Sequence, residues 1–410
     1  DLGAGPLAVM VAFIMGAILI LPVAMVYGRL VSKYPDAGGA LAYAQTAFGS
    51  GAGFITGWFL ALGYVMLCPF EAIAIGQLAE ALFPTLQTMP LYTVGGHVIY
   101  APTLVVEIVF TIIIVYGNFK GVDKVAKIQK TLVYAILGVA ALAIGLSLIY
   151  GTSIDKVFMV AGTKQNPEAN FFKGVLMVLA ITPFFYSGFD TISHESEEKS
   201  EDVCGDKVGN TILVSVLGAG IFYVLMVLGV GNAMPWPELI KYQLPASAAF
   251  NVGMGMPIAG KIIIFGALCG LISSLNSFFI AGARVLYAMG RDGMIADAFG
   301  KIHPEHQTPI HANVFICVIT IVGIFFGRRL LLPIINITSL GFMFSWMMAC
   351  AASYKMQNKD GGPKMSFKNK AVNIGAIICS FAMLLILIVP GSPGALEWPL
   401  EWCIMFFWLF

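Results

Sequence analysis

The segment from Gly174 to Asp206 contains residue types at a spacing that could bind a small polar ligand. An apolar run of helix-forming residues meets Pro183, and Gly188 and Asp190 follow shortly after it. Pro183 removes a helical hydrogen bond and Gly188 permits non-helical dihedrals, so the pattern predicts a broken helix. A break exposes the carbonyls of one half-helix and the amides of the next, which suit a polar or ionic ligand. The alternative is a proline kink in which Asp190 caps the second half-helix.

Glu71 is a second residue that could carry chemistry. It follows a charge-free run from Phe54 to Phe70 and precedes another apolar stretch. A carboxylate at the centre of a membrane span costs ~2.5–3.5 kcal/mol on insertion scales, so it should face protein or water. There it could carry a proton or bind a cationic group. In the alternative, Pro69 loosens the helix and Glu71 hydrogen-bonds the freed backbone groups.

The chain that positions these residues is strongly apolar. Of its 410 residues 59% are hydrophobic and 11% charged, and the mean hydropathy is +0.87, outside the range of a soluble domain. Its long charge-free runs lack the alternation of barrel strands, and lipid otherwise permits only helices. The composition therefore predicts an all-α integral membrane protein. We expect ten spans and the start of another, at residues 6–27, 54–82, 102–116, 131–150, 174–196, 210–234, 260–284, 311–326, 331–354, 371–390 and from 398 onward.

The basic residues predict the orientation of these spans. Most of the 23 Lys and Arg fall in alternate connections on one side, which the positive-inside rule assigns to the cytoplasm. The span at 6–27 then runs inward from outside, so we expect a preceding span that this sequence lacks. The sequence starts at Asp1 and stops at Phe410 within an apolar stretch, so we expect both ends to be cut. Without a linker, residues 1–410 form one domain.

Several other classes of function are disfavoured. The net charge of +1 and the lack of a dense basic block predict no nucleic-acid partner. The seven scattered cysteines include no Cys-x-x-Cys pair, which argues against a disulfide framework or zinc site. A membrane-embedded enzyme would need a convergent catalytic cluster, yet no histidine lies in a span core and no carboxylates are paired at helical spacing. We therefore predict no enzymatic activity and no cofactor. For Glu107, near the outer end of the span at 102–116, we predict an interfacial or structural role.

Four segments together resemble the amino acid, polyamine and organocation (APC) superfamily of permeases. The stretch FFYSGFD at 184–190, followed by Glu197 and Glu198, resembles that superfamily's sixth helix. The other three segments resemble the loop after the second helix, the loop between the fourth and fifth helices, and the eighth helix with its following loop; they are YPDAGGALAYAQTAFG (34–49), GNFKGVDKVAKIQKT (117–131) and LNSFFIAGARVLYAMGRDGMIADAFGKIHPEHQTP (275–309). The matches occur in the family's order and extend over nearly the whole chain.

The resemblance implies an inverted-repeat helical bundle of the leucine-transporter type, with substrate held between broken first and sixth helices. The first span here matches the family's second helix, so this chain lacks the family's first helix and ends early in its twelfth. Position by position, the sixth-helix pattern implicates an unwound, substrate-facing stretch of Phe184, Phe185, Tyr186, Ser187 and Gly188. Its carbonyls would receive a substrate ammonium, and its rings would cap or gate the pocket unless they only pack the core. Glu71 falls at a position that resembles a substrate-lining one.

The resemblance also bears on coupling ions. Ser273 and Ser274 resemble paired hydroxyls that the eighth helix contributes to a sodium site in sodium-coupled relatives, although serines in membrane helices often serve only packing. Proton-coupled relatives commonly have a lysine in the fifth helix. The run from Thr131 to Ile154 contains none, and Lys130 lies at the cytoplasmic margin. Coupling to Na+ at the serines or to H+ through Glu71 therefore stays open.

These features predict a secondary active transporter of the cell (plasma) membrane that moves amino acids or related amines by alternating access, coupled to an ion. The alternative is a sensor or auxiliary membrane subunit that keeps the fold without transport. The expected partners are a small-molecule substrate and the lipid bilayer. Glu71 favours a substrate with a cationic group, whereas the aromatic residues at 184–186 suit an apolar side chain equally well.

Overall fold

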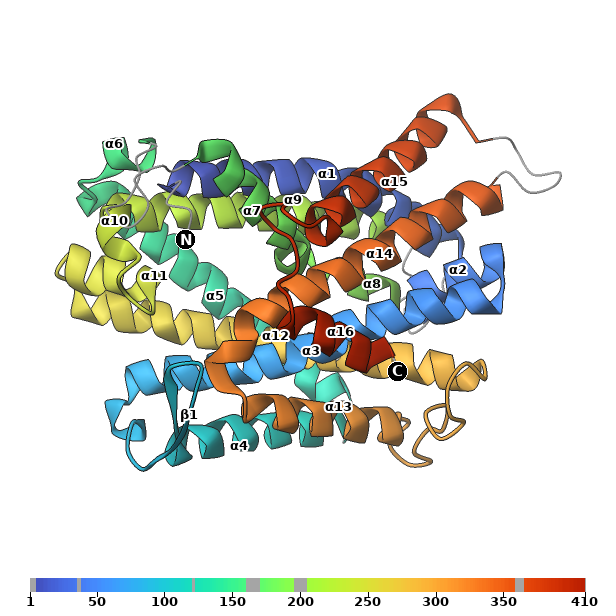
Figure 1. The fold of residues 1–410 in the computed structure, drawn as a ribbon, viewed down its shortest axis with the longest axis horizontal. Helices are drawn as coiled ribbons and strands as arrows, with labels where there is room; N and C mark the ends of the chain where they lie inside the picture. The colour runs from blue at the N-terminus through green and yellow to red at the C-terminus, as the bar shows by residue number, and fades with distance from the viewer. Residues whose placement is uncertain are drawn as a thin grey trace.

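The computed structural model describes residues 5–34, 38–119, 122–159, 170–194, 205–357 and 365–409. Its long helices lie side by side along one direction (Figure 1). The α-helices are α1 (Gly5–Lys33), α2 (Ala40–Phe48), α3 (Ser50–Leu82), α4 (Ala101–Phe119), α5 (Val122–Tyr150), α6 (Ile154–Val157), α7 (Phe171–Tyr186), α8 (Thr191–His194), α9 (Gly205–Ala233), α10 (Trp236–Leu239), α11 (Pro245–Ala248), α12 (Pro257–Arg291), α13 (Ile310–Ile324), α14 (Leu331–Gln357), α15 (Phe367–Ile388) and α16 (Leu400–Leu409).

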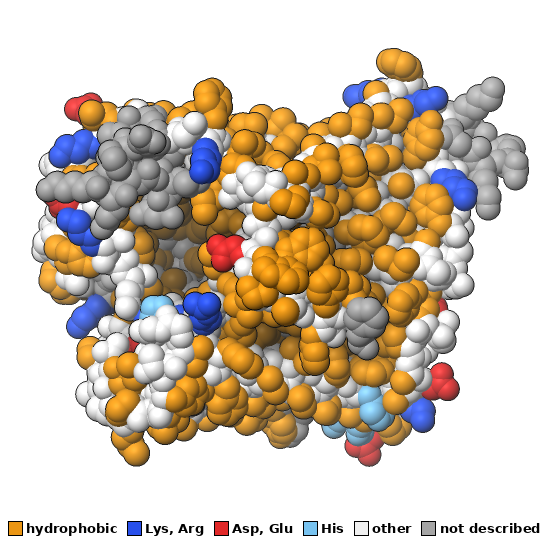
Figure 2. All heavy atoms as spheres, in the orientation of Figure 1, with side chains coloured by type: hydrophobic (Ala, Val, Ile, Leu, Met, Phe, Trp, Pro, Cys, Tyr) orange, Lys and Arg blue, Asp and Glu red, His pale blue; other side chains and the backbone are white. Residues whose placement is uncertain are grey.

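The predicted spans correspond to these helices. Among the described residues, nine helical stretches are long and apolar enough to cross a membrane, which confirms a multi-pass, all-α membrane protein. The span predicted at 311–326 is the 15-residue helix α13, about 22 Å long at ~1.5 Å per residue. Hydrophobic side chains cover the middle of the face in Figure 2, and most charged side chains gather towards its two ends. This distribution matches an apolar bilayer between two aqueous sides.

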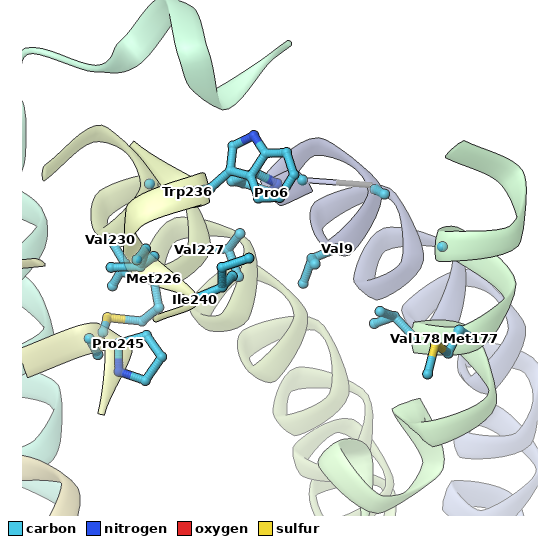
Figure 3. A pocket seen from close by; sticks show the side chains of 16 residues that line it. Pro6, Val9, Met177, Val178, Met226, Val227, Val230, Trp236, Ile240 and Pro245 are labelled. Carbon is cyan, nitrogen blue, oxygen red and sulfur yellow. The ribbon is translucent and has the colours of Figure 1, made fainter. Parts of the chain in front are cut away.

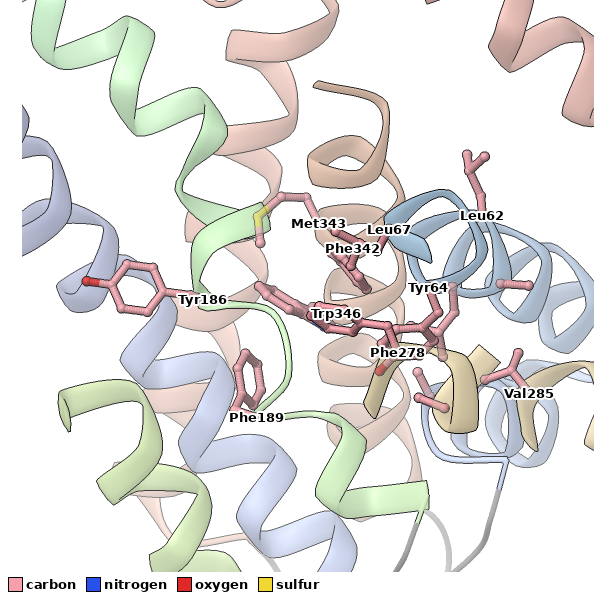
Figure 4. Close-up of a cluster of buried hydrophobic side chains, with 14 of the residues drawn as sticks. Leu62, Tyr64, Leu67, Tyr186, Phe189, Phe278, Val285, Phe342, Met343 and Trp346 are labelled. Carbon is pink, nitrogen blue, oxygen red and sulfur yellow. The ribbon is translucent and has the colours of Figure 1, made fainter. Parts of the chain in front are cut away.

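The long helices pack in two groups. Helix α1 lies against α9 and α7, whereas α3 lies against α12, α13 and α4. Helix α14 contacts both groups, through α3 and α7. Large aromatic side chains fill the space between the groups, and Tyr64, Phe342 and Trp346 are fully buried there (Figure 4). The interior between the two groups is therefore where polar groups would be shielded from lipid.

A β-hairpin stands at one end of the bundle and was not expected from the sequence. Strands β1 (Pro90–Val94) and β2 (His97–Tyr100) pair antiparallel, with Thr93 opposite Val98. Gly95 and Gly96 connect them with φ of 57° and 83°, the left-handed backbone that a two-residue hairpin turn requires. The hairpin lies at the same end as α10 and α11 (Figure 1), which is the predicted outer side.

Three short helical segments complete the structure. They are η1 (Pro84–Leu86), the π-helical turn η3 (Ala249–Gly253) and η4 (Gly327–Leu330). The turn η4 links α13 to α14 at the hairpin end, next to β2. At the opposite end, α2 packs against α3 and α14. This helix lies within residues 34–49, the segment that resembles a loop in the sequence.

Candidate functional site

The helix expected at 174–196 is interrupted at the predicted place. Helix α7 ends at Tyr186, and α8 begins at Thr191. Pro183 lies in the last turn of α7, and Gly188 has a φ of 111° that only glycine adopts without strain. Four residues, 187–190, therefore connect two helical segments without continuing the helix.

Asp190 fixes the conformation of this break. Its carboxylate accepts hydrogen bonds from the Tyr64 hydroxyl at 2.7 Å, the Trp346 indole N–H at 2.9 Å and the Gly188 amide at 3.1 Å. The side chain is 1% exposed. It does not cap α8, because Ser193 donates to the backbone carbonyl of Asp190 instead. From the sequence, the role predicted for Asp190 is that of a cap on the second half-helix. A carboxylate inside a membrane span is itself a signal of function.

The break lies at about the middle of the membrane-spanning region. Tyr64 is near the centre of the 33-residue α3, and Trp346 is near the centre of the 27-residue α14. Phe278 of α12 stacks on the Tyr64 ring, with centroids 6.3 Å apart. Figure 4 shows Tyr64, Phe278 and Trp346 grouped next to the unwound segment that carries Phe189. The non-helical backbone is thus enclosed by protein, as lipid requires.

Glu71 lies on the same face of α3 as Tyr64. Seven residues separate the two, which is nearly two full turns, so Glu71 is ~10 Å closer to the predicted outer side. It is 5% exposed, Ser274 of α12 lies near its carboxylate, and its Oε2 has no partner among the described residues. The alternative in which Glu71 bonds backbone groups freed by Pro69 is not observed.

The three aromatic residues at 184–186 have different surroundings. The Phe184 ring meets the Phe70 ring edge-on at 4.8 Å, next to Glu71. The Phe185 ring packs on Phe13 of α1, with ring centroids 5.3 Å apart. Tyr186 points towards α1 (Figure 4) and donates its hydroxyl to the Phe13 carbonyl at 2.8 Å. Phe184 therefore contacts α3 at the residue before Glu71, whereas Phe185 and Tyr186 pack towards α1.

The carbonyl groups at the break differ in whether they have donors. The Phe184 carbonyl accepts from the Ser187 amide and hydroxyl, and the Phe185 carbonyl accepts from the Tyr223 hydroxyl at 2.8 Å. The carbonyls of Tyr186 and Ser187 accept no hydrogen bond from any described residue. These two carbonyls are the ones available to an ammonium ligand.

The two serines of α12 lie at its midpoint. Ser274 donates its hydroxyl to the carbonyls of Gly270 and Leu271 at 3.1 and 3.2 Å, a bonding pattern common in membrane helices. The Ser273 hydroxyl has no hydrogen bond to the described part of the chain. Ser274 thus joins the Glu71 surroundings, but its role towards sodium stays a prediction. Glu197 and Glu198, which follow the sixth-helix motif, lie outside the described residues.

A separate apolar cavity of about 640 Å³ lies towards the outer end (Figure 3). Its walls come from α1, α7, α9, α10 and α11 and include Val9, Val178, Val227 and Trp236. Within the described ranges, no group of three or more His, Cys, Asp or Glu side chains could hold a metal ion. None of the polar side chains described at the break lines this cavity.

A multi-helix membrane bundle with one helix broken at mid-depth beside buried polar groups has the architecture of a membrane transporter. The chain belongs to the amino acid permease family, whose family model matches residues 2–410. It is therefore a transport permease, not an enzyme, and the resemblance to the APC superfamily is confirmed.

Three curated relatives illustrate the range of this family. The methylthioribose transporter of Bacillus subtilis (strain 168) is 26% identical over 389 residues, which cover 92% of this chain and 79% of the relative. The branched-chain amino acid permease BcaP of Lactococcus lactis is 26% identical over 379 residues, 89% of this chain and 78% of the relative. The low-affinity putrescine importer PlaP of Escherichia coli (strain K12) is 26% identical over 341 residues, 80% and 70% respectively. Small molecules are thus the cargo named for all three.

Proposed function

We propose that the protein is a secondary active transporter in the plasma membrane that moves an amino acid or related amine and binds it at the break between α7 and α8. The observation that supports this most directly is the pair of Tyr186 and Ser187 carbonyls, which have no described donor. A substrate ammonium would supply the donors. Glu71 and Phe184 would contact the rest of the substrate.

The two side chains suit different parts of a substrate. The Glu71 carboxylate, with one oxygen lacking a partner, would attract a second cationic group or carry a proton. The Phe184 ring would pack against an apolar side chain. A substrate with an amine at one end and a short apolar portion fits both, and amines and branched-chain amino acids share these features.

Transport would proceed by alternating access, in which α1, α7 and α9 move relative to α3, α4, α12 and α13. Asp190 joins these groups on the cytoplasmic side of Glu71, through Tyr64. Loss of that contact would open a path from the break to the cytoplasm. Either Na+ bound near Ser273 and Ser274 or H+ carried by Glu71 would drive the cycle.

A thermal-shift experiment tests the proposal, because a ligand that binds the native state raises apparent stability. The purified protein would be heated with leucine, arginine, putrescine or methylthioribose, each with and without sodium. Stabilisation by an amino acid or amine supports the proposal, and its dependence on sodium or on pH indicates the coupling ion. A folded protein that responds only to methylthioribose would contradict the amine substrate. A folded protein that responds to none would favour a sensor or auxiliary subunit.

A further inference from the structure

A second group of buried ionisable residues lies at the hairpin end, away from the break. The carboxylate of Glu80, near the end of α3, accepts from Arg328 at 2.6 Å and from the Thr103 hydroxyl at 2.7 Å. Arg328, in η4, also donates to the Gln243 side chain at 2.7 Å, in the loop between α10 and α11. Both oxygens of Glu80 therefore have donors, and Arg328 has two acceptors.

Glu107 lies one turn deeper than this ion pair. It follows Thr103 by four residues on the same face of α4 and opposes Gly76, four residues before Glu80 on α3. A Cβ atom at Gly76 would lie 2.0 Å from the Glu107 Oε1, so only glycine leaves space for this carboxylate. Glu107 is 5% exposed, and its carboxylate has no hydrogen bond to any described residue. Glu80 of α3 and Glu107 of α4 therefore lie near the same cavity. The spacing of residues along a single helix does not reveal this, because the two carboxylates belong to different helices.

The Glu107 side chain borders a cavity of about 20 Å³, room for about one water molecule. The titratable residues in its wall, besides Glu107, are Glu80 of α3, His97 and Tyr100 of β2, and Arg328 of η4. No described residue of α5, α12 or α13 lines it. Tyr92 of β1 does not line the cavity, and it donates its hydroxyl to the Phe325 carbonyl at 2.7 Å.

The charges around the cavity compensate the Glu107 charge only in part, because Arg328 attracts it and Glu80 repels it. Arg328 is the one guanidinium in the cavity wall, and its contacts go to Glu80 and Gln243. An ionised carboxylate that is buried without a partner carries a desolvation penalty of several kcal/mol, about enough to shift it to its neutral form. A metal cation would also compensate the carboxylate. The cavity, however, has room for only about one water, and the neighbouring guanidinium would repel a second positive charge there.

A route connects this carboxylate with the hairpin end of the protein. A larger cavity of about 210 Å³ lies beside the loop between α10 and α11, lined by Gln87, Gln243 and Leu244. It shares Gln77, Glu80 and Arg328 with the small cavity, so the two cavities lie on either side of these residues. Water from the predicted outer side would reach Glu107 past Arg328.

We propose that Glu107 is a proton-binding site, separate from the substrate site at the break, that exchanges its proton with the outer medium through these two cavities. The proton occupies the carboxyl group itself and needs no further ligand. The site does not depend on which substrate the break binds. It goes beyond the interfacial or structural role that the sequence predicts for Glu107.

Infrared difference spectroscopy of the purified protein tests this directly. A protonated carboxyl group in apolar surroundings has a separate C=O stretching band, and Glu107→Gln should remove the intensity of one such group at neutral pH. Glu238→Gln, at an exposed position of α10 on the same side, is the matched control and should leave the band unchanged. The band should shift in heavy water, since the site is reached from the medium. An unchanged spectrum in Glu107→Gln would overturn the proposal, and so would loss of the wild-type band when sodium replaces choline, because the site would then hold sodium.

A second measurement needs no variant and covers the case in which Glu107→Gln fails to fold. Hydrophobic carbodiimides react with protonated carboxyl groups in apolar surroundings, and peptide mass spectrometry locates the product. Glu107 should be modified in the unaltered protein, and the rate should fall as the medium becomes more alkaline. Modification confined to other carboxyl groups would contradict the proposal.

Discussion

The hydroxyl of Tyr64 lies 2.7 Å from the carboxylate of Asp190 and joins the centre of α3 to the break between α7 and α8. The bond is buried, and the indole of Trp346 donates to the same oxygen. Since α3 and α7 belong to different packing groups, this carboxylate holds the two groups together. Any motion that separates the groups at this depth must break it.

Replacing Asp190 should therefore destabilise the fold. In Asp190→Ala the Trp346 indole and the Gly188 amide lose their acceptor, and each buried donor left in this way costs about 1–3 kcal/mol. We expect the free energy of unfolding to fall by about 3 kcal/mol in detergent. Asp190→Asn keeps an acceptor oxygen and should lose less. Equal losses in the two variants would show that these hydrogen bonds do not hold the break.

The charge of Glu71 should matter for transport more than for stability. Glu71→Gln keeps the size of the side chain, so the protein should fold, while uptake of a cationic substrate should fall by about tenfold or more, the effect of losing one charged hydrogen bond. Uptake measured across a pH series, with the exposed Glu238→Gln as control, checks this. Unchanged uptake with an unchanged pH profile would exclude a functional role for Glu71.

Phe184 and Tyr186 should respond differently to substitution. Phe184→Leu removes a ring at the proposed substrate site, so binding of an apolar substrate should weaken by about tenfold. Tyr186→Phe removes only the hydrogen bond to the Phe13 carbonyl, and should lower the free energy of unfolding by about 1 kcal/mol without changing substrate preference. Ligand titrations and unfolding curves of both variants separate the two roles. A changed preference in Tyr186→Phe would place that ring in the substrate pocket.

A sodium site at α12 would depend on both serine hydroxyls. In Ser273→Ala/Ser274→Ala, any rise in thermal stability caused by sodium should be lost, while stabilisation by substrate alone should persist in part. Ser277→Ala is a suitable control, since its hydroxyl donates to the Ser273 carbonyl one turn away. If the double variant still responds to sodium, the ion binds elsewhere.

The ion pair between Arg328 and Glu80 gives a prediction for the outer side. Arg328→Met leaves the buried Glu80 carboxylate without its cation and should cost about 3–5 kcal/mol of unfolding free energy. Glu80→Gln in the same protein should recover most of that loss, because no unpaired charge is then left. A double-mutant cycle on unfolding curves measures the coupling. Additive effects would mean that the two side chains do not interact in solution.

Much of the fold follows from the sequence. The charge-free runs predict where the long helices lie, because a backbone in lipid must satisfy its own hydrogen bonds. The proline and glycine at 183 and 188 predict the interruption after α7, since they alter the backbone locally. The hairpin was missed, although Gly95 and Gly96 between β-branched residues were a usable signal.

The contacts between helices were decided by the tertiary structure alone. The position of Asp190 after the helix break predicts a cap. Its side-chain partners Tyr64 and Trp346, however, are 126 and 156 residues away along the chain. Similarly, the positions of Glu80 and Glu107 in separate helices conceal their approach, which arises because α3 and α4 pack antiparallel with a glycine between them. The sequence by itself determines which residues enter the membrane, since hydropathy acts along each segment. Which of their polar groups meet depends on how helices distant in sequence pack, and only the assembled bundle determines that.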